Sequence, residues 1–257
     1  MDFAEYERLK QFEERYWWHV GRRFILEELL KKYLFKIRSL RHDSHKLQIL
    51  DVGCGTGGSS LVLSRFGKLT GLDNSELALK LAVGANFSDL VLGEITNLPF
   101  KDDIFDCLSV LDVLEHISDR EDSIAIKECW RVLKADGLIV IAVPVYQWLW
   151  SGHDEALGHK RRYTLGKLVC DLEAGGFEIV FKSYIVSFLA PLIFTYRLLE
   201  RILRHKQQTS YVLFPKIIDD IFATSLRIEA FFIKIGIRFP FGVSAVVLAT
   251  KSISTQQ

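Results

Sequence analysis

Apolar residues in the middle of the chain fall into short runs that end at glycine or acidic residues. The runs have the length of β-strands: LQILDV, KLTGLD, LVLGE, FDCLSVL and GLIVIAVPV. Helix-like segments stand between them, including one capped by Ser75 and one that begins with a Ser118 and Glu121 capping box and runs to about Lys134. This alternation predicts a parallel sheet with helices on both faces.

The rest of the chain extends this pattern at both ends. Residues 5–36 are rich in Glu, Lys and aromatic residues and predict helices that break near Gly21. Thr164 is the predicted cap of a helix ending at Gly175, and FEIVFKSYI follows as a sixth strand. Two long apolar, helix-like stretches then precede FGVSAVVLATK, the last predicted strand.

We therefore expect one α/β domain over residues 1–257. Its sheet should be doubly wound, Rossmann-like, seven-stranded and mostly parallel. Residues 1–45 would form an N-terminal helical extension, and residues 187–240 a helical insertion before the last strand.

The balance of charged residues limits the classes of molecule that the protein is expected to bind. The 257 residues include 33 Lys and Arg against 32 Asp and Glu, so the chain lacks the global cationic field that non-specific nucleic-acid binding needs. We expect no nucleic-acid partner, and the oligomeric state stays undetermined. The cysteines are scattered without metal-ligand spacing, which is typical of reduced thiols in the cytoplasm: Cys54, Cys107, Cys129 and Cys170. The charged N-terminus lacks the apolar core of a signal peptide.

A glycine cluster follows the first predicted strand, where doubly wound sheets bind ligands. Gly53, Gly55 and Gly57 permit a tight turn and a close approach of the backbone to a ligand. With Gly58 the spacing also satisfies GxGxxG, so a nicotinamide-dependent oxidoreductase is one interpretation. Asp51 favours another, because its carboxylate would repel a pyrophosphate and suits the cationic amino end of S-adenosylmethionine.

Four longer runs carry a family resemblance. ILDVGCGTGG, GLDNS, LPFKDDIFDCLSVLDVLEHI and LKADGLIVIAVP, within residues 49–145, resemble successive motifs of class I S-adenosylmethionine-dependent methyltransferases. The resemblance implies S-adenosylmethionine as cofactor, with Asp73 at its ribose and the Glu94 region at its adenine. The full set of cofactor residues that it implies is Asp51, Gly53, Gly55, Gly57, Asp73, Asn74, Glu94, Ile95 and Asp112.

The run LDVLEHI lies where such an enzyme presents the methyl group. Methyl transfer requires a well-placed nucleophile, and a hydroxyl acceptor also needs a base. We predict His116 as that base, with His153 and His159 as further catalytic candidates. The alternative is that His116 and Glu115 only orient the loop.

The same run has a metal-binding interpretation. The spacing of Asp112, Glu115 and His116 resembles the acidic, acidic, His arrangement that holds a divalent metal in some methyltransferases, and His153 or His159 could complete it. Related sequences carry a similar stretch without a metal role, so we predict no metal site.

A basic segment, GHKRRYT, follows the fifth predicted strand. Guanidinium groups beside a sulfonium cation are unfavourable unless an anion joins them, so Arg161 and Arg162, with Tyr163, predict an anionic acceptor. The N-terminal run RYWWHVGRR adds Trp18 and Arg22 to the predicted acceptor-binding residues.

These basic segments also resemble a subgroup of bacterial methyltransferases of envelope polysaccharide and lipid-linked sugar pathways. The resemblance implies O-methylation of an anionic, lipid-linked or glycosyl acceptor. From 183 to 240, eight Lys and Arg against four Asp and Glu stand among apolar residues, which predicts helices lying peripherally on the inner face of the cell membrane. A soluble small-molecule O-methyltransferase, with these helices as an internal lid or a dimer contact, is the alternative.

Overall fold

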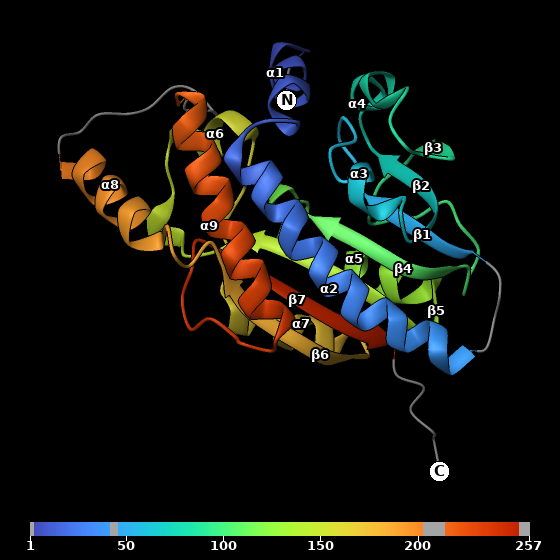
Figure 1. The fold of residues 1–257 in the computed structure, drawn as a ribbon. Helices are drawn as coiled ribbons and strands as arrows, with labels where there is room; N and C mark the ends of the chain where they lie inside the picture. The colour runs from blue at the N-terminus through green and yellow to red at the C-terminus, as the bar shows by residue number, and fades with distance from the viewer. Residues whose placement is uncertain (1–2, 42–45, 203–213, 252–257) are drawn as a thin grey trace.

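A computed structural model describes residues 3–41, 46–202 and 214–251, and one seven-stranded sheet runs through them (Figure 1). The strands are β1 (Leu47–Val52), β2 (Gly67–Asp73), β3 (Asp89–Leu92), β4 (Phe105–Leu111), β5 (Leu133–Pro144), β6 (Phe177–Ile185) and β7 (Ser244–Lys251). Their order is β3-β2-β1-β4-β5-β7-β6, with β7 antiparallel to both of its neighbours and the other pairs parallel. The predicted doubly wound, mostly parallel, Rossmann-like fold is confirmed.

Helices cover both faces of this sheet. They are α1 (Phe3–Glu13), α2 (Trp17–Arg41), α3 (Ser60–Leu63), α4 (Glu76–Ala82), α5 (Asp122–Val132), α6 (Gly152–Leu157), α7 (Leu165–Ala174), α8 (Ala190–Ile202) and α9 (Lys216–Lys234), with 3-10 turns η1 (Leu114–His116) and η2 (Gln147–Leu149). Ile49 packs into the core under α2 and α9, whereas its neighbour Leu50 packs into the core under α5 and α7. Successive strand residues thus fill opposite layers, as the period of a β-strand requires.

The cap residues of α4 and α7 behave as the sequence predicts, but the predicted Ser118–Glu121 capping box does not cap α5, whose N-cap is Glu121 without a side-chain cap hydrogen bond. The Ser75 hydroxyl accepts from the Ala78 N–H, and the Thr164 hydroxyl accepts from the Lys167 N–H. The helix predicted to reach Lys134 ends at Val132 instead. β5 begins directly after it because Leu133 pairs with Phe105 of β4.

Gly21 does not break the N-terminal helices. The chain leaves helix geometry between Glu13 and Trp17, and α2 continues through Gly21 to Arg41. A Cβ on Gly21 would lie 2.4 Å from Leu226 Cδ1 of α9, so the absence of a side chain at Gly21 lets the two long helices approach closely. Figure 1 shows α2 and α9 side by side along one face of the sheet.

The predicted insertion at 187–240 contains α8 and α9, so its helical character is confirmed for the part that is described. Residues 203–213 between them lie outside the described residues, as do 1–2 and 42–45 of the predicted N-terminal extension. In Figure 1, α8 projects from the body of the fold, whereas α9 packs along α2. None of the helices in the described ranges is both long and apolar enough to span a membrane.

Candidate active site

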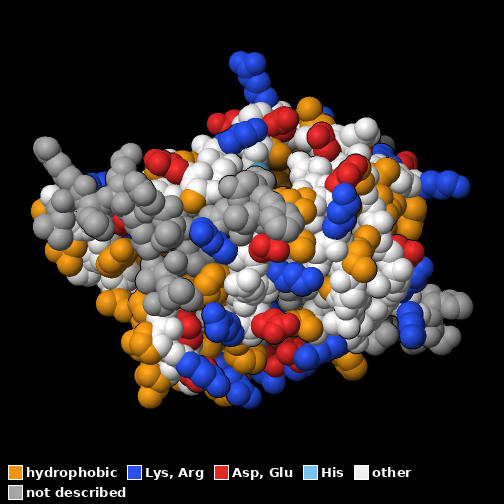
Figure 2. All heavy atoms as spheres, turned by 90° about the horizontal axis from the view of Figure 1, so that it is seen from above, with side chains coloured by type: hydrophobic (Ala, Val, Ile, Leu, Met, Phe, Trp, Pro, Cys, Tyr) orange, Lys and Arg blue, Asp and Glu red, His pale blue; other side chains and the backbone are white. Residues whose placement is uncertain are grey.

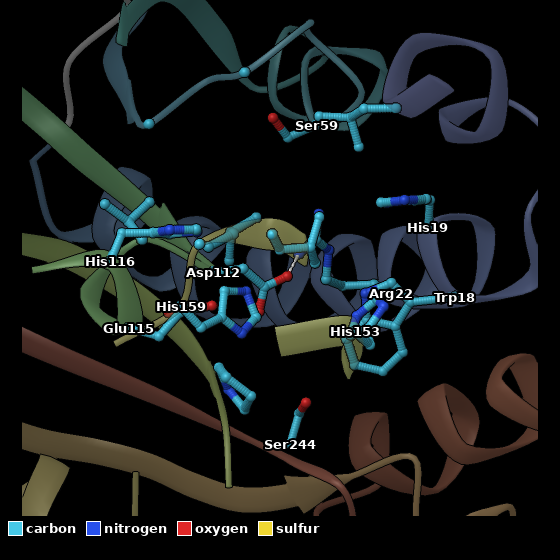
Figure 3. A pocket seen from close by; sticks show the side chains of 18 of the residues that line it. Trp18, His19, Arg22, Ser59, Asp112, Glu115, His116, His153, His159 and Ser244 are labelled. Carbon is cyan, nitrogen blue, oxygen red and sulfur yellow. Dashed lines mark hydrogen bonds and ion pairs between the residues drawn. The ribbon is translucent and has the colours of Figure 1, made fainter. Parts of the chain in front are cut away.

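A cavity of about 880 Å³ lies beyond the carboxyl ends of β1, β2 and β4 (Figure 3). The strand order reverses between β1 and β4, and in doubly wound sheets ligands bind at such a point. Helices α1 and α2 supply part of the wall, and α8 and α9 supply another part. The volume is in the range of small-molecule sites in proteins.

Asp51 ends β1 as a buried carboxylate in the cavity wall. Burial raises the pKa of Asp51 to about 6, although a hydrogen bond from the Ser59 hydroxyl opposes the shift. A cationic ligand group would restore the charged form, because an opposite charge nearby favours the carboxylate. The site therefore fits an ammonium group at this position.

The glycine loop after β1 is shaped for a ligand. Gly55 has φ +55°, a conformation that glycine adopts without strain, and a Cβ there would meet only Leu9 Cδ2, at 3.8 Å. A side chain at this position would therefore project into the open cavity. Gly53 has φ +68°, and a Cβ there would lie 2.4 Å from Val113 Cγ2, so the loop closely approaches the segment that follows β4. Gly57, also predicted to bind the cofactor, does not line the cavity; a Cβ there would lie 2.8 Å from Ala85 Cβ.

Asp73 ends β2 beside this loop. One of its carboxylate oxygens accepts from the Gly55 N–H and the other from the Ser75 N–H, each at 2.9 Å. Burial raises the pKa of Asp73. Asp73 lines the cavity, and a carboxylate oxygen can accept more than one hydrogen bond, so a ribose hydroxyl could also donate to it. Asn74, Glu94 and Ile95, the other residues predicted near the ribose and adenine, also line the cavity.

Arg22 and Asp112, predicted for acceptor and cofactor respectively, form an ion pair with each other across the cavity wall (Figure 3). Trp18, one turn earlier on α2, also lines the cavity. Asp112 has φ +55° and carries its side chain from the end of β4 toward α2. The pair joins the N-terminal helices to the sheet, so each charge is compensated within the protein.

The three predicted catalytic histidines all line the cavity: His116, His153 and His159. The ring centroids of His116 and His159 are 4.9 Å apart, and those of His153 and His159 are 6.3 Å apart. Burial lowers the pKa of His116 to about 4, with the neighbouring His159 adding to the shift. Its imidazole is therefore uncharged at neutral pH.

Arg161 and Tyr163 do not line the cavity, which corrects their predicted place in the acceptor site. The Arg161 guanidinium is ion-paired with Asp119 and Asp122, and it also donates to the Tyr163 hydroxyl. Tyr163 is buried, and its hydroxyl donates to Asp122 at 2.7 Å. These two residues anchor the loop after β5 to the start of α5, because the charge of Arg161 and the hydroxyl of Tyr163 are paired with Asp122 there.

Arg162 lines the cavity but is not free to hold an anion. Its Nε and one terminal nitrogen donate to the two carboxylate oxygens of Asp154, at 2.8 and 3.0 Å. Asp154 is fully buried and also accepts from His159 Nδ1 at 3.0 Å. Burial alone would raise the pKa of Asp154, but hydrogen bonds from His159 and Arg162 hold it well below its usual range.

Replacing Arg162 by Ala should therefore destabilise the protein. The variant leaves the buried Asp154 carboxylate without its bidentate partner, at a cost of roughly 2–3 kcal/mol. We expect Tm to fall by roughly 4–12 °C in differential scanning calorimetry. The exposed neighbour Lys160, changed to Ala, is the matched control and should leave Tm unchanged. Equal Tm for both variants would contradict the structural role of Arg162.

Sequence reasoning did not find the contribution of α1. Tyr6, Leu9 and Glu13 reach the cavity, and Glu13 packs against the glycine loop at Gly58. Burial raises the pKa of Glu13. No local pattern signals this role, because α1 takes its position from long-range packing against α4.

The sequence of residues 50–141 matches the model of the methyltransferase domain family. This part of the chain is similar in sequence to methyltransferase domains. A protein of Mycolicibacterium smegmatis named as an S-adenosylmethionine-dependent methyltransferase is 28% identical over 65% of this chain and 61% of its own length. Demethylmenaquinone methyltransferase of Thermotoga maritima is 36% identical over 37% of this chain and 42% of its own length. Both matches span less than two thirds of the relative.

Solved structures share the fold. One from Galdieria sulphuraria, assigned as a sarcosine dimethylglycine methyltransferase, superposes with a TM-score of 0.57 and 17% identity, over 88% of this chain and 85% of its own. The family match decides between the two cofactors that the glycine loop left open, and the methyltransferase domain uses S-adenosylmethionine. The residues present fit it, because Asp51 offers a buried carboxylate for its ammonium group and Asp73 offers oxygens for its ribose.

Proposed function

We propose that the protein methylates an oxygen atom of a lipid-bearing acceptor at the inner surface of the cell membrane. S-adenosylmethionine supplies an electrophilic methyl group, and the residues of the chain bind and orient the two reactants. The observation that carries the proposal is the extent of the cavity, which reaches from the glycine loop to the apolar helices α8 and α9.

The far end of the cavity is suited to a hydrocarbon chain. It is lined by apolar side chains from α8, α9 and their flanking segments: Leu189, Leu192, Ile193, Tyr196, Phe214 and Phe222. Leu192 and Tyr196 are 56% and 46% exposed, so this end of the cavity opens to solvent. A lipid-linked acceptor could enter here with its apolar part on α8 and its reactive oxygen toward His116.

Helix α9 has two apolar faces. Ala223, Leu226, Ala230 and Ile233 form one buried face, packed toward α2. The opposite face carries Ile217, Ile221, Ile228, Phe231 and Ile235, each between 49% and 70% exposed. Their spacing of three, four and seven residues places them on one stripe of the helix. A second, uncovered apolar stripe of this length marks an interaction surface.

Charged residues flank this exposed stripe. Lys216, Arg227 and Lys234 are eleven and seven residues apart, so they share one flank of α9 with the exposed Asp220, and Lys234 also pairs with Glu28 of α2. Helix α8 adds exposed Leu198, Leu199 and Ile202. Figure 2 shows hydrophobic side chains gathered at the edge of the molecule where α8 projects, with Lys and Arg elsewhere on this face. Apolar area beside basic residues is the composition of an interfacial helix.

The prediction that the acceptor is anionic no longer has support from the two arginines after β5. Arg161 and Arg162 are both satisfied by carboxylates of the protein, so they do not require an anion from the acceptor. We therefore base the proposal on the lipid character of the acceptor alone.

Vesicle flotation tests membrane binding. The wild type should float with vesicles containing phosphatidylglycerol at low salt and float less at high salt, because salt screens the basic flank. Changing Ile217, Ile221 and Phe231 together to Ser should lower the partition coefficient by about 10–100-fold, since three apolar side chains lose their contact with lipid. The free protein should keep its Tm, because these side chains are exposed.

Matched changes elsewhere control for general surface hydrophobicity. Val83 and Ile124 are 70% and 49% exposed and lie far from α9 in the chain. Changing both to Ser should leave flotation intact. If the wild type stays at the bottom of the gradient and sediments as a dimer that the α9 variant dissociates, the stripe is a dimer contact. If it stays there as a monomer, the stripe belongs to a lid.

The chemical class of the acceptor can be determined from cell extracts. Transfer of labelled methyl groups from S-adenosylmethionine into membrane, sugar and soluble extracts should label the lipid-extractable fraction. Label found only in water-soluble small molecules would favour the alternative of a soluble O-methyltransferase.

A further inference from the structure

Three side chains with metal-binding chemistry converge at one point of the cavity wall (Figure 3). Glu115 and His116 stand on η1, directly after β4, and His159 stands on the loop after α6. Each offers one potential ligand atom, and these atoms lie within 4.8 Å of one another. The two segments are held together because the Lys160 N–H donates to the Glu115 backbone carbonyl at 2.8 Å.

Glu115 is the unusual member of this cluster. Its side chain is fully buried, and neither carboxylate oxygen has a hydrogen-bond partner on another residue. Buried polar groups in proteins are almost always paired, because an unpaired one loses its hydration without compensation. A cation bound between Glu115 and the two histidines would supply the missing partner.

A hydrogen bond to one ring nitrogen fixes the orientation of each imidazole, as is usual for metal-ligand histidines. His159 Nδ1 lies 3.0 Å from Asp154 Oδ1, and Asp154 is itself held by Arg162. The His116 ring hydrogen-bonds to the backbone of Gly158. In metal sites, the second ring nitrogen of a ligand histidine usually donates to a carboxylate or a backbone carbonyl in this way. For His159 this leaves Nε2 available for an ion.

We propose that Glu115, His116 and His159 form a binding site for one divalent transition-metal ion of the zinc type. Two imidazoles and one carboxylate are a ligand set of zinc sites that keep a further position open, whereas Mg²⁺ and Ca²⁺ prefer oxygen ligands alone. Asp112, which the sequence grouped with Glu115 and His116, is instead ion-paired with Arg22. This proposal departs from the expectation, drawn from the sequence, that no metal is bound.

The site would act on the acceptor and not on the cofactor. Its three residues line the same cavity as Asp51 but come from the loops after β4 and α6. An ion held there could take an acceptor oxygen as a further ligand, and a metal lowers the pKa of a bound hydroxyl. Metal binding itself requires neither the acceptor nor the proposed methyl transfer.

Isothermal titration calorimetry with Zn²⁺ tests the site directly. The protein, purified without a histidine tag and dialysed against a chelator, should bind one Zn²⁺ per chain, and Mg²⁺ should give no heat. Glu115→Gln and His159→Ala should each weaken Zn²⁺ binding by at least ~10–100-fold. Glu115→Gln should keep the Tm of the metal-free protein but lose the rise in Tm that Zn²⁺ produces in the wild type.

Two neighbouring variants are the controls. His153→Ala removes a histidine whose ring lies 6.3 Å from that of His159, and Glu155→Gln removes an exposed carboxylate of α6. Both should bind Zn²⁺ as the wild type does. Absence of Zn²⁺ binding by the wild type, or equal binding by Glu115→Gln, would overturn the proposal. Binding of S-adenosylhomocysteine by all variants should be unchanged, so failure of the metal site is distinguishable from failure of the cofactor site.

Discussion

Changing Asp51 to Asn should weaken the binding of S-adenosylhomocysteine by roughly 10²–10³-fold. Asp51 is the buried carboxylate at the end of β1, and the ammonium group of the cofactor is the cation assigned to it. Removing one partner of a buried charge pair costs about 3–5 kcal/mol, and each ~1.4 kcal/mol corresponds to a tenfold change in affinity. Isothermal titration calorimetry at pH 7.5 measures this loss, and circular dichroism checks that the sheet is intact.

The same carboxyl gives the wild type a characteristic pH dependence. The pKa of Asp51 is about 6, so the group is a carboxylate above this pH and takes up a proton below it. The ammonium group of the ligand stays charged throughout this range. Affinity for S-adenosylhomocysteine should therefore be full above pH 6 and fall up to about tenfold per unit below it. The Asn variant should lack this dependence.

Gly55→Leu tests the same cofactor site by steric exclusion instead of by loss of charge. The new side chain would project into the cavity, where only Leu9 lies within 4 Å of the Cβ position. It should therefore exclude the ligand sterically. Asp89→Asn, which removes an exposed carboxylate of β3, is the charge-matched control and should bind normally. Wild-type affinity in both Asp51→Asn and Gly55→Leu would contradict the placement of the cofactor.

The strands and the cofactor loop could be predicted because their signals are local. An apolar run such as FDCLSVL is typical of a strand that is buried on both faces of the sheet. All seven of its residues are buried in β4. Gly53 and Gly55 indicate a turn without any contact to a distant residue. Both adopt positive φ, a conformation that favours glycine. Asp51 and Asp73 follow from their places at strand ends, because parallel strands bring those ends to one edge.

Gly21 shows where local patterns mislead. A glycine within a helical stretch usually weakens the helix, so the sequence predicted a break. The structure uses the missing side chain to let α9 approach α2 at Leu226, 205 positions further along the chain. No window of local sequence contains that contact.

The arginines of the loop after β5 were misassigned for a related reason. A basic run beside a ligand site resembles an anion-binding surface until its partners are known. The partners of Arg161 are Asp119 and Asp122, more than 35 residues earlier, brought close by the adjacency of β4 and β5. The partner of Arg162 is only eight residues away, but Asp154 faces inward because it closes a capping box with Ser151 at the start of α6.

The positions of the candidate catalytic histidines could be predicted from the sequence only in part. His116 could be placed near the acceptor because it follows β4 directly, at the ligand edge of the sheet. That it meets His159, 43 residues later, depends on the loops after β4 and α6 lying together, which only the fold reveals. Glu115 was noted in the sequence only beside His116, and its burial without a partner is a property of the folded state.

Changing His116 to Ala should lower the turnover of methyl transfer by ~10²–10⁴-fold while leaving the affinity for S-adenosylhomocysteine within about twofold of the wild type. The side chain lies on the acceptor side of the cavity, and burial holds the pKa of its imidazole near 4, so the ring is uncharged at neutral pH. An uncharged ring can accept the proton of a hydroxyl acceptor or hold a metal ion, and its loss removes either function.

Labelled methyl transfer into the acceptor-containing extract measures turnover, and calorimetry measures cofactor affinity. Glu155→Gln, an exposed change in α6, is the control and should retain full turnover. If His116 is only a base, dialysis of the wild type against a chelator leaves turnover unchanged. If it is a metal ligand, dialysis reproduces the loss, and Zn²⁺ restores turnover to the wild type but not to the variant. Full turnover in His116→Ala would contradict both roles and leave this residue as part of the loop that shapes the cavity.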